Sequence, residues 1–120
     1  AQICGHAGFA HAPGWFTTAP IFAARKLLKK LGWQASDVDV WEVNEAFAVV
    51  AMAFIRELEI DPEHVNIHGG ACALGHPIGA SGARILVSLL NALQQSGGSK
   101  GLAAICLGGG EGIAVAVEAA

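Results

Sequence analysis

The stretch from Gly101 to Leu107 restricts the fold more than any other part of the sequence, because almost every residue in it is apolar. Glycines at 97–98 precede it and glycines at 108–110 follow it, so turn-forming residues bound it on both sides. A strand without polar alternation has to be covered on both faces, as happens when helices lie on each side of a sheet. The stretch therefore predicts a buried strand in a layered α/β domain.

The remaining segments alternate between strand-like and helix-like patterns, without an internal repeat or a linker. The expected order is β-α-β-α-β-α-β-β, which gives one α/β domain over residues 1–120 with a five-stranded mixed sheet and helices on its faces. The last strand is expected to pair antiparallel with the strand before it. The expected strands are residues 1–9, 38–43, 65–68, 101–107 and 112–117, and the expected helices are residues 20–31, residues 44–58 and a helix that follows the loop at 69–82.

Local signals set the ends of the expected helices. Pro20 suits the first turn of a helix, where its missing N–H costs nothing, and Gly32 supplies the stop. Asn44 belongs to the residue types that best cap a helix, so the second helix is expected to begin there. Helical spacing then predicts a buried stripe of Phe47, Val50, Ala51, Phe54, Ile55 and Leu58.

Composition argues against several classes of protein. The net charge is −3 and the seven Lys and Arg residues are scattered, which argues against a nucleic-acid surface. No apolar run reaches the length of a membrane span, so no membrane segment is expected. The three cysteines suit a reducing, cytoplasmic location better than a disulfide framework. Hydrophobic residues make up 53% of the chain, which is consistent with an extra apolar face that needs a partner and with a piece of a longer polypeptide.

Three polar clusters fall where strands end and helices or turns begin, which is where open α/β sheets place their sites. The first cluster is Asn44-Glu45-Ala46-Phe47. As a helix cap, Asn44 is explained without a site, and Glu45 suits the positive end of a helix. Capping and a site role are compatible if the side-chain amide also holds a water.

The second cluster is the glycine-rich loop at 69–82, with His76-Pro77 near its centre. A lone histidine is more often structural than catalytic. However, the glycines permit close approach of the backbone to a bound group, and a rigid turn before a helix resembles a preorganised site. Both interpretations of His76 stay open at this point. Ser81 is expected to form a hydrogen bond at the helix entry, and Arg84 is expected to be solvated or in a structural ion pair.

The third cluster is Cys106-Leu107-Gly108-Gly109-Gly110-Glu111-Gly112. A cysteine in an apolar strand is usually a small core residue, and three glycines usually make a tight turn. Cys106 differs because it lies at the end of the strand, next to backbone N–H groups that are free to point at an oxyanion. The cluster by itself favours the structural interpretation.

Taken together, the clusters are far more specific than any one of them. Asn-Glu-Ala-Phe, the long Gly-His-Pro loop and Cys-x-Gly-Gly-Gly-x-Gly occur in the order and approximate spacing of the thiolase family, which the chain resembles over essentially its whole length. Subunits of that family have two similar halves. The resemblance therefore implies the C-terminal half, with the N-terminal half absent from this sequence.

The resemblance also implies a chemistry, which is acyl transfer between coenzyme A thioesters by Claisen condensation or thiolysis. His76 would activate the nucleophilic cysteine of the missing half and donate a hydrogen bond to the thioester oxygen. Asn44 would hold the water that completes this oxyanion hole. Cys106 would carry the second proton, at the α carbon of the acetyl-CoA unit, and the N–H of Gly108 would contribute to the other oxyanion hole.

Further expectations concern substrate and partners. Phe16 stands where many relatives have a methionine beside the acyl pocket, which suggests a short acetyl or acetoacetyl chain. Ala46 and Phe47 would line the pantetheine channel, although Phe47 also fits a helix core, which we favour. The family implies acyl-CoA substrates without a covalently bound cofactor. As partners it implies the N-terminal half and a homo-oligomer, dimeric or tetrameric.

Two rival interpretations remain. Cys4 and Cys72 are alternative nucleophiles, but nothing near Cys4 in the sequence activates it, and Cys72 with His76 supplies only two ligands, too few for a metal site. We therefore expect both cysteines to be packing residues. The other rival is an isolated thiolase-like module with a structural or docking role. Without the acylated cysteine, the chain alone is expected to be inactive.

Overall fold

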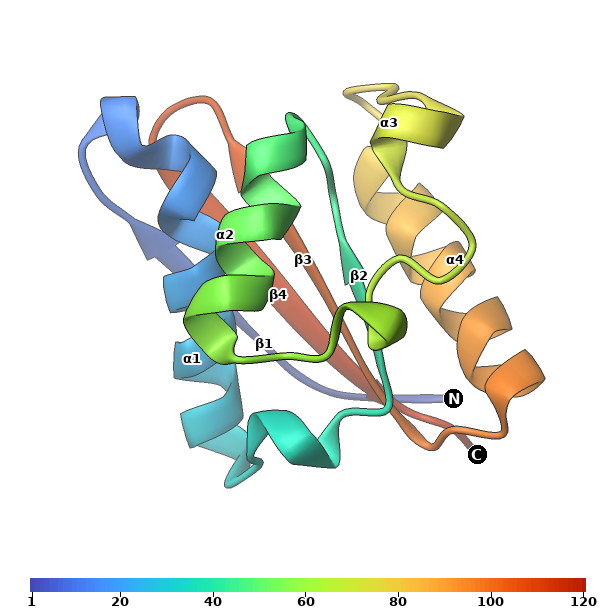
Figure 1. Ribbon diagram of the computed structural model, residues 1–120. Helices are drawn as coiled ribbons and strands as arrows, with labels where there is room; N and C mark the ends of the chain where they lie inside the picture. The colour runs from blue at the N-terminus through green and yellow to red at the C-terminus, as the bar shows by residue number, and fades with distance from the viewer.

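A computed structural model describes all residues from 1 to 120. Its centre is a four-stranded mixed sheet with the strand order β1-β4-β3-β2 (Figure 1). β4 pairs antiparallel with both of its neighbours, whereas β2 and β3 are parallel. The strands are β1 (Gln2–Ala10), β2 (Val40–Val43), β3 (Lys100–Leu107) and β4 (Glu111–Glu118).

The prediction of a five-stranded sheet is wrong, because residues 65–68 do not form a strand. Val65 makes only an isolated parallel bridge with Trp41 of β2. Asn66 then takes a left-handed backbone conformation with φ 51°, which turns the chain away from the sheet. The side-chain amide of Asn66 takes the place of the hydrogen bonds that a fifth strand would make with β2. Its oxygen accepts from the N–H of Val43 at 2.8 Å, and its nitrogen donates to the carbonyl of Val43 at 2.9 Å. One side chain therefore covers the edge of β2 that the fifth strand was expected to cover.

Helices α1 (Ala19–Leu31) and α2 (Ala48–Leu58) cover one face of the sheet (Figure 1). The predicted ends of α1 are confirmed, with Pro20 in its first turn and Gly32 as a left-handed C-cap. The apolar sides of both helices pack with one face of the sheet into the larger of two cores. The largest fully buried members of this core are Trp41, Phe54, Leu27 and Leu102.

Helix α4 (Ser81–Ser96) covers the other face, above β2 and β3. Leu89 and Leu93 of α4 lie so close to Gly101 that a Cβ there would come within 3.0 Å of them. The prediction of coverage on both faces is thus confirmed for residues 101–104, whereas Leu107 at the end of the run is 45% exposed. Helix α3 (Ala71–Leu74), one turn long, and three short 3₁₀ turns complete the fold. None of the helices has both the length and the apolar character needed to cross a bilayer.

Gly110 is held in a conformation and a space that only glycine fits. Its φ is 95°, and a Cβ there would lie 2.2 Å from the carbonyl oxygen of His11. We expect Gly110→Ala to lower the free energy of unfolding by roughly 2–4 kcal/mol, combining backbone strain and overpacking. Chemical denaturation measures this change. Gly109→Ala is the matched control, because only Glu111 would approach its Cβ, at 3.8 Å, and its stability should stay near wild type. Equal stability of the two variants would contradict the expectation.

Candidate active site

The three polar clusters lie at the carboxyl edge of the sheet, which is the end at which β2 and β3 terminate. β2 and β3 are parallel and end together there, and the N–H of Asn44, just beyond β2, donates to the carbonyl of Ala104 in β3 at 2.9 Å. β3 ends at Leu107 on the same edge and turns through 108–110 into β4. Helix α4 runs back toward the start of β3, so its N-terminus and the loop before it also lie at this edge (Figure 1).

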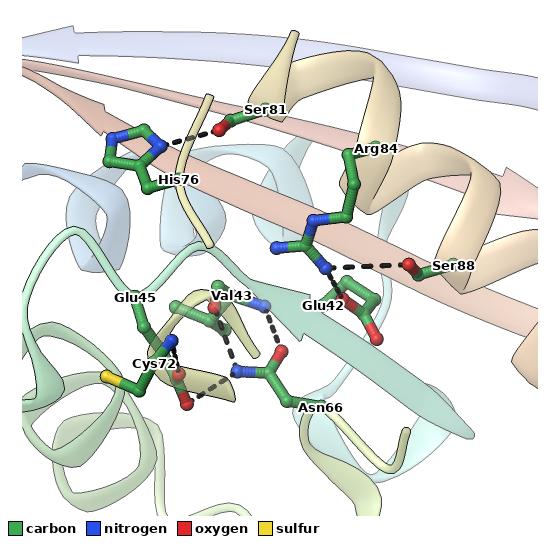
Figure 2. Close-up of polar contacts among 9 residues, drawn as sticks. All are labelled: Glu42, Val43, Glu45, Asn66, Cys72, His76, Ser81, Arg84 and Ser88. Atoms are coloured by element: carbon green, nitrogen blue, oxygen red, sulfur yellow. Dashed lines mark hydrogen bonds and ion pairs between the residues drawn. The ribbon is translucent and has the colours of Figure 1, made fainter. Parts of the chain in front are cut away.

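His76 lies in the exposed loop between α3 and α4 and is oriented by the first residue of α4. Its Nδ1 is 2.5 Å from the Ser81 hydroxyl (Figure 2). The hydroxyl also donates to the carbonyl of Pro77 at 3.1 Å. When the Ser81 hydroxyl donates to Pro77, its oxygen accepts from Nδ1, and Nε2 is then the unprotonated nitrogen of a neutral ring. The expectation that Ser81 forms a hydrogen bond at the helix entry is confirmed.

Cys106 is buried, with 8% of its surface exposed, and its side chain packs into the core beneath α1 and α2. Burial raises the pKa of the Cys106 thiol, and its own backbone offsets this only in part. The resting group is therefore a neutral thiol, able to donate a proton.

Asn44 is not the helix cap that its position suggested. Residues 44–47 precede the helix, and Phe47 occupies the cap position of α2. The Asn44 side chain is fully buried, and neither its Oδ1 nor its Nδ2 has a hydrogen-bond partner. A buried amide without partners is costly, so its free atoms are better explained by a site than by capping.

Glu45 was interpreted only as a helix-end residue, but it holds the glycine-rich loop in place. One carboxylate oxygen accepts from the N–H of Cys72 at 2.8 Å, and the other accepts from the Asn66 side chain at 3.2 Å (Figure 2). Gly70 makes room for it, since a Cβ there would come within 2.3 Å of the carboxylate carbon. The pair of glycines at 69–70 was the only local signal of this contact.

The proposed substrate residues lie at the surface of this edge. Phe47 is 59% exposed, so the prediction that it is a core residue is wrong. Its ring lies edge-on to that of Phe16, with centroids 6.3 Å apart. Ala46 is half-buried beside it, and nothing lies within 4 Å of a Cβ built on Gly108. Phe16 and Phe47 thus come together although they are 31 positions apart.

Of the two other cysteines, Cys4 packs against the core as expected, whereas Cys72 does not. Cys72 is exposed, so its assignment as a packing residue is wrong, and it lies in α3, where the sequence predicted no helix. Cys4 is half-buried in β1, at the opposite end of the sheet from Cys106. The thiol pKa is raised in both, by burial and then by Glu118 at Cys4 and chiefly by Glu45 at Cys72, which disfavours the nucleophilic thiolate.

The chain belongs to the thiolase family, because residues 1–119 match the family model described as "Thiolase, C-terminal domain". Among individual proteins, the chain is similar to acetyl-CoA acetyltransferases. It is 51% identical to the cytosolic enzyme of Rattus norvegicus and 54% identical to the mitochondrial enzyme of that species, in each case over 98% of this chain.

Solved structures give the same result. The Acat5 thiolase of Ascaris suum in complex with coenzyme A is 47% identical, with a TM-score of 0.93, and covers 98% of this chain. The acetyl-CoA acetyltransferase of Bacillus anthracis is 44% identical, with a TM-score of 0.95 and the same coverage. The chain spans only 30% of each of these structures, and 27–30% of the two rat enzymes.

Proposed function

We propose that this chain is the C-terminal catalytic half of a thiolase of the acetyl-CoA acetyltransferase type. The observation that carries the proposal is that the motif of Asn44, the loop of His76 and the turn after Cys106 all lie at the same end of the sheet. An imidazole base, a neutral thiol and an unpartnered buried amide suit a reaction that moves two protons and develops charge on a thioester oxygen.

In thiolysis, His76 Nε2 takes the proton of the nucleophilic cysteine supplied by the other half. The resulting thiolate attacks the 3-keto carbon of acetoacetyl-CoA, and the bond between the α and β carbons breaks. The electron pair forms the enolate of acetyl-CoA, whose α carbon receives the proton of Cys106. The raised pKa of the buried thiol suits this donation.

The second half-reaction restores the groups. The Cys106 thiolate takes the proton of an incoming coenzyme A thiol, whose sulfur attacks the acylated cysteine. Acetyl-CoA leaves, and the released cysteine thiolate again faces the His76 imidazolium. Condensation is the reverse of these steps. His76 and a water on Asn44 bind the enolate oxygen, and the N–H of Gly108 serves the other oxyanion, where one such donor is worth about 3–4 kcal/mol.

The substrate and its position follow from the aromatic pair. Phe16 closes the acyl pocket to a short chain, and Ala46 with the exposed Phe47 lines the path of the pantetheine arm. The bound coenzyme A in the Ascaris suum thiolase supports a CoA thioester substrate. No cofactor takes part in these steps. A cytoplasmic location stays a prediction, since cytosolic and mitochondrial relatives are similarly close.

The partner half is expected on the α4 side of the sheet. Ile105 and Leu107 point to this side, because the alternate residues Ala104 and Cys106 pack on the other. Leu107 is 45% exposed, and Val87 on α4 is 68% exposed. An apolar face of this kind suits burial against the N-terminal half. Assembly of complete subunits into dimers or tetramers belongs to the same proposal.

The 120-residue chain by itself is expected to show no thiolysis of acetoacetyl-CoA. The nucleophile that holds the acyl group is not among its own cysteines, since Cys106 carries protons and Cys4 and Cys72 have raised pKa values. The measurement is acetyl-CoA release by the purified chain, with the full-length enzyme as the positive control. Turnover by the chain would contradict the assignment. Turnover by neither protein would favour the structural or docking module.

A further inference from the structure

Glu42 and Arg84 form an ion pair inside the protein that the steps above do not use. Glu42 lies in β2, fully buried, and its Oε2 is 3.3 Å from Nη1 of Arg84 on α4 (Figure 2). The same Arg84 nitrogen donates to the Ser88 hydroxyl at 3.4 Å. Glu42 Oε1 and Arg84 Nε and Nη2 have no partner. The pair is thus buried but incompletely bonded.

Stability does not explain such a pair. Its surroundings are apolar, with Val40, Ile85 and Leu89 in the same core. A buried ion pair in this setting is often no more stable than hydrophobic residues of similar volume, because both charges lose their hydration. Burial is strong enough here to raise the pKa of Glu42 to about 7, with Arg84 opposing the rise and Glu45 adding to it. Because desolvation of the two charges is costly, we look for a role of the pair other than stabilising the core.

The pair joins the two elements that carry the reacting groups. Glu42 and Asn44 are two positions apart on an extended segment, so they point to the same side. Ser81 and Arg84 are three positions apart on α4, so they share a helix face. Ser81 in turn holds Nδ1 of His76. The ion pair therefore joins the strand that leads to the amide and the helix whose first residue contacts the imidazole.

We propose that Glu42 and Arg84 are positioning residues for the reaction. By tying the first turns of α4 to the end of β2, the pair fixes the Ser81 hydroxyl under His76 and the Asn44 amide beside it. The two groups of the oxyanion hole for the enolate, His76 and Asn44, are then both held in place by this ion pair. This inference rests on the proposed function, and it adds two residues that contact neither substrate nor reacting atoms.

The test uses the full-length enzyme with Glu42→Leu, Arg84→Met and the double variant. Each single change leaves one buried charge unpaired, so the melting temperature should fall, whereas the double variant should recover most of it. We expect kcat of the double variant to stay about 10- to 100-fold below wild type with KM nearly unchanged, because a small misplacement of reacting groups is enough for such a loss. Arg84→Lys, which keeps a charge, should retain more activity than Arg84→Met.

The outcomes separate the two proposals. Recovery of wild-type kcat together with the melting temperature in the double variant would show a purely structural pair and would overturn the inference. A low kcat at recovered stability supports it. Failure of the wild-type full-length enzyme to turn over CoA thioesters would instead overturn the proposed function itself.

Discussion

Replacing Cys106 by serine in the full-length enzyme is expected to abolish condensation and thiolysis, with kcat lower by about 10³-fold or more. The serine hydroxyl fills a similar volume, so the core beneath α1 and α2 should stay intact. It is a far weaker acid than the thiol, so it neither removes nor returns the α proton of acetyl-CoA. The measurement is kcat for acetoacetyl-CoA thiolysis, with exchange of the α protons of acetyl-CoA into D₂O as a second readout.

The control for this change is Cys4→Ser, the same chemical substitution at the opposite end of the sheet. The Cys4 Sγ forms hydrogen bonds only with Gln2 and Glu118, each at 3.9 Å, and kcat of this variant should equal that of wild type. The Cys106→Ser enzyme should still accept an acetyl group on its nucleophilic cysteine, because His76 serves that step. Near-normal turnover or proton exchange in Cys106→Ser would remove Cys106 from the mechanism.

His76→Ala is expected to lower kcat by a similar factor, but to affect the two half-reactions differently from Cys106→Ser. Both half-reactions use the imidazole, so acylation of the nucleophile and formation of the enolate should both slow, with kcat lower by roughly 10³-fold or more. Acetylation of the nucleophilic cysteine, followed by intact mass, separates this variant from Cys106→Ser. The helix that follows should be unaffected, since Ser81 keeps its bond to Pro77.

The matched control is His68→Ala, at another exposed histidine in the same part of the chain. No hydrogen bond orients its ring, and we expect wild-type kinetics. A His76→Ala enzyme with near-normal rates for both half-reactions would refute the role given to the imidazole.

Much of the fold could be predicted because its signals are local. The apolar run at 101–107 could only be a strand covered on both faces, and Gly32 and Gly97 end their helices in left-handed conformations as glycine allows. The antiparallel partner of that run followed from the turn at 108–110. Each of these features is decided by residues that are close in the sequence.

The errors arose where a distant residue decides the structure. Residues 65–68 resemble a strand, but Asn66 uses its side chain on Val43 and turns away. Asn44 is a good cap in general, but here its N–H donates to Ala104 of β3, and the helix begins only at Ala48. Helical periodicity then assigned Phe47 to the core, although the helix begins only after it. No local pattern contains these contacts.

The candidate site divides in the same way. His76, Cys106 and Gly108 could be found from motifs, because glycine-rich turns around reactive side chains leave a visible trace. Their supports could not be found. Glu45 contacts Cys72 across 27 positions, and Glu42 contacts Arg84 across 42. The sequence therefore predicted the candidate reacting groups, whereas the roles of Glu42 and Glu45 emerged only from the structure.

A crystal structure of the full-length enzyme with acetyl-CoA bound tests the central claim most directly. The account predicts one thioester between the two groups, with His76 Nε2 at hydrogen-bond distance, about 2.6–3.2 Å, from its oxygen. The Cys106 sulfur should be in contact with its methyl carbon on the other side. A thioester bound at any other part of the sheet, or one reached by only one of these two side chains, would contradict the account.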